Sequence, residues 1–226
     1  MSMVMGFDGI TGYVDCGNGA SLNLTTTISV ECMVNSKMFG PSVPGGAVGM
    51  LGKWLANDGW MLGWYSARAF YFFVKDAICI ETTGYTTYPV GWIHLVATYT
   101  GGAGTGKIYV NGVDKTVGSS ARALTNPASN LGVGCARCPP SVALQLLRGI
   151  IAYARVYNRV LSLTEIQYNI EHPNNPKRRG LVLNLTQESL FGGQWKDLSG
   201  NANHGTLVGG AAPVPSNNLA GRNVSL

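Results

Sequence analysis

Charged residues are scarce in this chain. They make up 12% of its 226 residues, about half of the usual share in soluble proteins. A surface with so little charge suggests contact with a partner. The net charge is +5, but the basic residues are scattered, and only 177–179 form a run, Lys-Arg-Arg. Because Pro and Asn residues precede this run, it indicates a solvated linker rather than a phosphate-binding patch, and we expect no nucleic-acid partner.

Long apolar runs are also missing. No stretch approaches the ~18 residues that a membrane-spanning helix needs, so we expect no membrane insertion. The first five residues, Met-Ser-Met-Val-Met, lack the charged and apolar regions of a secretory leader. We therefore expect a protein of an outer surface that reaches it by another route, or a secreted module that has lost its leader.

The cysteine pattern gives little support for a metal site or a disulfide framework. Five cysteines are an odd number, which argues against a complete set of disulfides. Cys16, Cys32 and Cys79 lie in apolar or alternating stretches, where buried free thiols are expected. Cys135 and Cys138 form a single C-x-x-C, which allows a small loop disulfide but lacks the second ligand pair of a zinc site.

Two signatures of hydrolases are not found. Retaining glycosidases need two carboxylates about 5 Å apart, which one strand supplies when acids stand at i and i+2 or i+4 on one face. The glutamates here are isolated along the chain: Glu31, Glu81, Glu165, Glu171 and Glu188. No Gly-x-Ser-x-Gly motif offers a nucleophile elbow. The sequence therefore predicts a protein that is not an enzyme.

The residues that are abundant predict a β protein. The chain has 31 glycines and is 46% apolar, which fits many tight turns around the core of one sandwich. Strands are expected at 26–34, 49–54, 60–65, 70–74, 92–99 and 107–113, with turns at 56–59, 101–106 and 111–112. Ser162 stands three residues before Glu165, a spacing typical of a capping box, which predicts one short helix near 162–171.

Three motifs resemble the laminin-G-like jelly rolls of the concanavalin A-like lectin and glucanase superfamily. They are Phe-Asp-Gly with Tyr-Val at 7–14, Gly-Trp-Ile-His-Leu-Val-Ala at 91–97 with Lys-Ile-Tyr-Val-Asn-Gly at 107–112, and a closing strand and helix at 149–166. The resemblance implies an all-β fold, a two-sheet antiparallel jelly-roll sandwich.

One departure from this family bears on metal binding. Many relatives carry an acidic pair where this chain has Ala152 and Tyr153, so a cation or ligand role of that pair is in doubt. Five aspartates remain as candidate oxygen ligands: Asp8, Asp15, Asp58, Asp114 and Asp197. No spacing gathers them as a calcium loop would. Calcium is therefore possible but unsupported, no cofactor is expected, and the metal ligands stay unknown.

The end of the chain is displaced relative to the family. Residues 195–209 resemble a segment that normally precedes the Phe-Asp-Gly motif, so the chain looks circularly permuted. We expect a jelly-roll core at 1–172, a linker at 173–180 and strands within 181–226, at 181–186, 205–208 and 221–226. These would complete the sandwich in the same chain or in a neighbouring copy, because unpaired sheet edges aggregate. The residues expected to serve this assembly are Trp195, Asp197, His204 and Leu226.

Aromatic residues form a candidate sugar-binding surface. Apolar sugar faces pack on aromatic rings, and Tyr85 and Tyr88 lie in a turn-rich segment that favours exposure. Trp54 and Trp60 are further candidates, although Trp60 shares a strand face with Leu62 and Trp64, a pattern that also fits the core.

These observations lead to a ranked prediction of function. First is a non-catalytic structural, decoration or attachment protein on an outer surface, as a component of a phage or virus capsid, with copies of itself or other structural proteins as partners. The alternative is a secreted carbohydrate-binding or adhesion module with glycan partners. A glucanase-type hydrolase is third, disfavoured by the missing carboxylate set.

Overall fold

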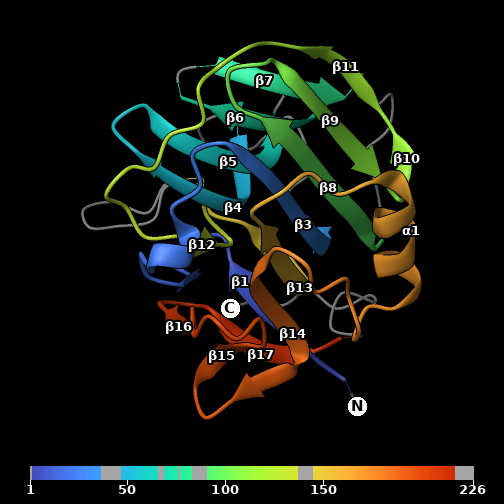
Figure 1. Ribbon diagram of the computed structural model, residues 1–226. Helices are drawn as coiled ribbons and strands as arrows, with labels where there is room; N and C mark the ends of the chain where they lie inside the picture. The colour runs from blue at the N-terminus through green and yellow to red at the C-terminus, as the bar shows by residue number, and fades with distance from the viewer. Residues whose placement is uncertain are drawn as a thin grey trace.

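The computed structural model describes residues 2–36, 47–65, 69–75, 77–82, 91–136 and 145–216. These residues form antiparallel strands in two layers, with one α-helix against the outer side of one layer (Figure 1). The expected all-β sandwich with a single short helix is confirmed. Among the described residues, no helix is long and apolar enough to cross a membrane.

The first layer runs in the order β17–β1–β13–β3–β8–β9–β10. Its strands are Ala212–Pro215 (β17), Met3–Asp8 (β1), Arg148–Tyr157 (β13), Thr27–Ser36 (β3), Ile93–Thr100 (β8), Thr105–Val110 (β9) and Val113–Asp114 (β10). The predicted strand pair around the glycine-rich turn is the β8–β9 hairpin.

The second layer runs in the order β15–β16–β2–β12–β4–β5–β6–β7–β11. Its strands are Gln194–Asp197 (β15), Gly205–Val208 (β16), Tyr13–Asp15 (β2), Gly132–Val133 (β12), Ala47–Leu55 (β4), Asp58–Tyr65 (β5), Ala69–Val74 (β6), Ala77–Thr82 (β7) and Thr116–Ser119 (β11). Strand β14 (Leu181–Phe191) pairs with β13 and with β15, and so joins the two layers.

The core lies between the layers and follows from the period of two along each strand. In β5, Trp60, Leu62 and Trp64 are at most 1% exposed and belong to the largest apolar cluster, whereas Met61 lies on the opposite face. Burying each such side chain stabilises the fold by roughly 1.5–3 kcal/mol. The core interpretation of these tryptophans therefore holds for Trp60 and Trp64.

Local signals in the sequence place the helix and one hairpin turn. Helix α1 (Leu163–Glu171) begins at Ser162, whose hydroxyl accepts a hydrogen bond from the Glu165 amide at 3.3 Å while the Glu165 carboxylate accepts one from the Ser162 amide at 3.0 Å. The predicted capping box is confirmed. Ala56 and Asn57 both have positive φ, which gives the two-residue hairpin turn between β4 and β5 its handedness.

The described C-terminal strands complete both layers within the chain. Segment 173–180 leads from α1 to β14, which pairs with β13, while β16 pairs with β2 and β17 with β1. The segment expected as a strand at 221–226 lies outside the described residues. The strand that pairs with β1 on the side opposite β13 is Ala212–Pro215.

Three of the cysteines are buried free thiols, as expected: Cys16, Cys32 and Cys79. Burial raises the pKa of the Cys16 and Cys32 thiols, so both stay protonated and inert at neutral pH. Cys135 is disulfide-bonded, and Cys138 lies outside the described residues.

Candidate functional site

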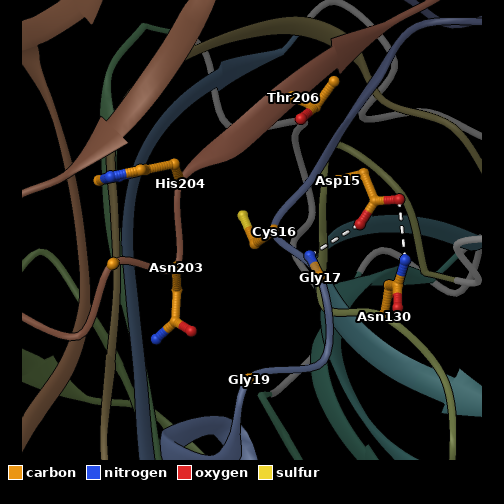
Figure 2. A pocket seen from close by; sticks show the side chains of 9 residues that line it. Asp15, Cys16, Gly17, Gly19, Asn130, Asn203, His204 and Thr206 are labelled. Atoms are coloured by element: carbon orange, nitrogen blue, oxygen red, sulfur yellow. Dashed lines mark hydrogen bonds between the residues drawn. The ribbon is translucent and has the colours of Figure 1, made fainter.

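A polar pocket of about 390 Å³ opens where the N-terminal part of the chain meets the C-terminal strands. It is lined by Asp15, Cys16, Gly17, Gly19, Asn130, Ala202, Asn203, His204 and Thr206, most of which Figure 2 shows around a central space. Strand β2 ends at Asp15, residue 130 precedes β12, and 202–206 lead into β16. The pocket therefore exists because β16 and β12 both pair with β2, and its volume lies at the small end of the range for ligand sites.

Asp15 supplies a carboxylate that is held in one orientation. One oxygen, Oδ1, accepts a hydrogen bond from the Gly17 amide at 2.8 Å, and the other, Oδ2, accepts one from the Asn130 side-chain amide at 2.9 Å (Figure 2). A carboxylate has about four acceptor positions, so each oxygen can accept a further hydrogen bond. Thr206, opposite Asp15 in the ladder, adds an exposed hydroxyl.

Asp197 shapes the turn that brings the tail to the pocket. Its Oδ1 accepts hydrogen bonds from the backbone amides of Asn184 at 2.8 Å and Ser199 at 2.9 Å, and its Oδ2 accepts one from the Asn203 amide at 3.0 Å. Carboxylates that accept several backbone amides are strong local organisers of turns. Asp197 is 6% exposed, so it acts on the pocket through the turn and not by touching a ligand.

Asn203 forms one wall of the pocket. Its side-chain nitrogen donates to the Ser21 hydroxyl and to the Val182 carbonyl, both at 2.8 Å. The amide oxygen is therefore turned toward the N-terminal segment, where a Cβ on Gly19 would come within 2.4 Å of it. Glycine at position 19 lets the two segments approach closely.

The remaining titratable groups of the lining are His204 and Cys16. The Asp197 amide donates to His204 Nδ1 at 3.0 Å, so Nδ1 is the unprotonated nitrogen and the neutral ring carries its proton on Nε2. In Figure 2 this ring lies at the rim and extends away from Asp15. Cys16 is 3% exposed with a raised thiol pKa, which makes it a neutral part of the pocket wall and not a nucleophile.

The acidic residues are distributed among separate elements. Within the described ranges, no group of three or more His, Cys, Asp and Glu side chains gathers as a metal site. Glu31 is paired with Arg155, and Glu165 with Arg159. Among the described residues, Asp15 is the only carboxylate that lines the pocket, whereas glycoside hydrolysis by the usual route needs two.

The two described residues of the predicted aromatic site, Trp54 and Trp60, do not line the pocket. Tyr85 and Tyr88 fall outside the described residues. Trp60 is 1% exposed in the core beside Phe72, and Trp54 is 2% exposed on the outer face of the second layer, where its ring meets Phe73 edge-on at 4.7 Å between centroids. Neither indole offers a ring face to a ligand, because both are covered by other residues of the chain.

Of the three described residues predicted for assembly, one lines the pocket and one shapes the turn beside it. Trp195 is fully buried, and its indole nitrogen donates to the Thr186 carbonyl at 2.7 Å. His204 lines the pocket and Asp197 shapes its turn, while Leu226 lies outside the described residues. The pocket residues Asn130, Asn203 and Thr206 were missed by the sequence analysis, because they are brought together only by the pairing of both β12 and β16 with β2.

The sequence matches the family model of the concanavalin A-like lectin/glucanases superfamily over residues 8–167. The chain belongs to this family. The resemblance carried by its motifs is thereby confirmed. None of the curated proteins matches the sequence.

Two solved structures share the lectin-like fold. One is a proposed carbohydrate-binding protein from Bacteroides ovatus, with a TM-score of 0.68 and 16% identity over 95% of this chain and 60% of that one. The other is a heptameric SAP-like pentraxin from Limulus polyphemus, with a TM-score of 0.56 and 12% identity over 74% of this chain and 81% of that one. The chain thus spans only 60% of the length of the first protein. At these identities, the similarity shows a common fold.

Proposed function

We propose that the protein is a carbohydrate-binding module that holds a sugar residue in the pocket beside Asp15. The observation that carries the proposal is the Asp15 carboxylate, fixed by Gly17 and Asn130 and open to further donors. Sugar hydroxyls donate and accept hydrogen bonds, so a carboxylate, amides and a hydroxyl around one small pocket match them. The family and the fold of its neighbours support the same function.

The arrangement favours binding without turnover. The Asp15 carboxylate is already oriented before a ligand binds, which reduces the conformational entropy lost on binding. The described residues of the lining include no second carboxylate, so they do not supply both the acid and the base that cleave a glycosidic bond. This supports a lectin-like role over a glucanase-type one.

The virion hypothesis loses the support of one of the three features that ranked it first. Those features were the scarce charge, the missing leader and the strand-like C-terminal segment, which the sequence allowed to pair in the same chain or in a neighbouring copy. In this chain β14, β16 and β17 pair with β13, β2 and β1, so the tail is explained without a neighbouring copy. We therefore rank a glycan-binding module of an outer surface above a structural component of a capsid.

The test is a glycan array followed by titration calorimetry with pocket variants. Asp15→Asn replaces the carboxylate with a neutral amide, and Thr206→Val replaces the hydroxyl with a methyl group, both with little change in shape. Loss of a hydrogen bond to the charged Asp15 should weaken binding by about tenfold or more, and loss of one to the neutral Thr206 hydroxyl by about two- to tenfold. Asp114→Asn and Thr105→Val are matched controls, because both residues are exposed and lie on other strands. A blank array, or pocket variants that bind like the wild type, would refute the proposal.

A further inference from the structure

We infer that the pocket selects neutral sugars and rejects acidic ones, and that Asp15 is the residue that determines this specificity. The inference rests on the proposed function and adds the class of ligand to it. The net charge of the whole chain would predict the opposite preference. That charge is +5 and would by itself favour acidic glycans such as uronic-acid polymers.

The charge at the pocket has the opposite sign to the charge of the chain. Among the described residues, no lysine or arginine lines it, and Asp15 is the only described residue of the lining with a formal charge at neutral pH. The groups that hold the carboxylate, the Gly17 amide and the Asn130 side chain, are both neutral. A sugar in the pocket therefore meets a negative charge that its hydrogen-bond partners do not neutralise.

The other titratable groups of the described lining do not offset the negative charge of Asp15. His204 Nδ1 accepts a hydrogen bond from the Asp197 amide at 3.0 Å, and its ring extends away from Asp15 (Figure 2). The Cys16 thiol is buried and uncharged. Within the lining, then, nothing compensates for the carboxylate of an acidic sugar.

The lining also decides how a sugar is recognised. Its described residues include no Trp, Tyr or Phe, so they offer no ring for stacking and recognise a sugar through its hydroxyl groups. A ligand carboxylate within several ångströms of Asp15 would lose these hydrogen bonds and add repulsion. Allowing for the open mouth of the pocket and for salt, we expect acidic sugars to bind at least about tenfold more weakly.

The experiment compares matched sugars that differ only at carbon 6. Methyl galactoside is titrated beside methyl galacturonoside, and methyl glucoside beside methyl glucuronoside, at pH 7 and physiological salt with the full chain. The neutral member of a pair should bind at least about tenfold more tightly. In Asp15→Asn the ratio of the affinities for the neutral and the acidic sugar should fall toward one, whereas the control Asp114→Asn should keep the wild-type ratio.

A second variant keeps the test decisive where Asp15→Asn binds neither sugar. Thr206→Lys adds a cation at the rim and should reduce the rejection of the acidic sugar, whereas the neutral Thr206→Gln should not. Equal binding of the neutral and acidic sugars by the wild type would overturn the inference and leave the proposed function standing. Failure of every neutral and acidic sugar to bind would overturn both.

Discussion

The Glu31 carboxylate lies 3.0 Å from the Arg155 guanidinium, and neither side chain is exposed to solvent. Glu31 also accepts hydrogen bonds from His94 at 2.9 Å and from Asn169 at 2.8 Å. Arg155 donates in addition to the Asn184 side chain and to the Pro173 carbonyl. The network thereby joins β3, β8, β13 and α1 to the segment that carries the C-terminal strands.

Removing the arginine from this network should be costly. Arg155→Met leaves the Glu31 charge buried without its cation, which destabilises folded proteins by about 3–5 kcal/mol. Urea unfolding of the wild type and the variant measures the loss. Lys107→Met is the control, because Lys107 and Asp114 form a 2.8 Å pair with 57% and 38% exposed side chains, and such pairs contribute under about 1 kcal/mol. Equal losses in the two variants would contradict a structural role for the buried pair.

The same network should make the protein sensitive to acid. Burial alone would raise the pKa of Glu31, but the charge of Arg155 and the contacts with His94 and Asn169 outweigh it and hold the pKa below its usual value. The unfolded chain therefore takes up this proton first as the pH falls, and the stability that Glu31 contributes at neutral pH is lost progressively below about pH 4.5.

The contribution of Glu31 is separated from that of the other acids by comparing the unfolding free energies of the wild type and Glu31→Gln. Asp8, Asp114 and Glu165 also have a lowered pKa, so acid destabilises every variant to some extent. The gap in unfolding free energy between the wild type and Glu31→Gln should narrow between pH 7 and pH 3. A gap that stays constant over this range would show that Glu31 does not contribute to the acid response.

Strands, turns and the helix could be predicted because their signals are local. Ser162 and Glu165 stand three residues apart and cap one another directly. The pocket could not be predicted in this way. Asp15 and Thr206 come from opposite ends of the chain, and they meet because β16 pairs with β2. The permuted motif pointed to this pairing, but it did not show which side chains the pairing leaves around a hollow.

In strand β4 a β-bulge interrupts the alternation of inward and outward side chains that the sequence pattern predicts. The register shifts between Gly49 and Leu51, and such a bulge moves the following side chains to the other face. Lys53 is paired with Trp60, so it shares the inward face with that core residue, while Trp54 points outward. Two tryptophans considered together from the sequence thus lie on opposite faces of the sheet.

Lys53 leads to a prediction in alkaline solution. Its ammonium is buried and contacts three neutral oxygens, from Asn23, Asn126 and Pro127. Burial lowers the pKa of Lys53 to about 8. Between this value and that of a free lysine, near 10.4, the unfolded chain binds more protons than the folded one, so Lys53 makes the protein more stable as the pH rises.

The pH dependence that Lys53 contributes is best measured as the difference in stability between the wild type and Lys53→Met. The raised pKa of the buried thiols Cys16 and Cys32 acts in the opposite direction, but equally in the wild type and in Lys53→Met. The stability of the wild type relative to Lys53→Met should increase from pH 7 to pH 10 by no more than about 3 kcal/mol. Lys115→Met, at an exposed position, should show no such trend. A flat difference for Lys53→Met would mean that the ammonium is not desolvated in solution.

Edge strand β17 bears on whether the protein associates through its sheet. The Ser216 amide donates to the Ser2 carbonyl at 3.0 Å, so alternate residues of β17 direct their amides toward β1. Pro213 and Pro215 occupy the other positions, whose nitrogens face away from β1. Proline has no amide hydrogen, and at such positions it prevents another strand from pairing.

We therefore predict that the full-length protein is a monomer that stays one on dilution, with its C-terminal strands on its own sheet. Replacing both prolines, in Pro213→Val/Pro215→Val, restores two outward amides and should produce concentration-dependent association, which light scattering coupled to gel filtration detects. Pro173→Val, in the exposed segment before β14, is the control and should remain monomeric. A wild-type dimer that dissociates when residues 177–226 are deleted would instead show that the tail completes the sheet of a neighbouring copy, as the sequence also allowed.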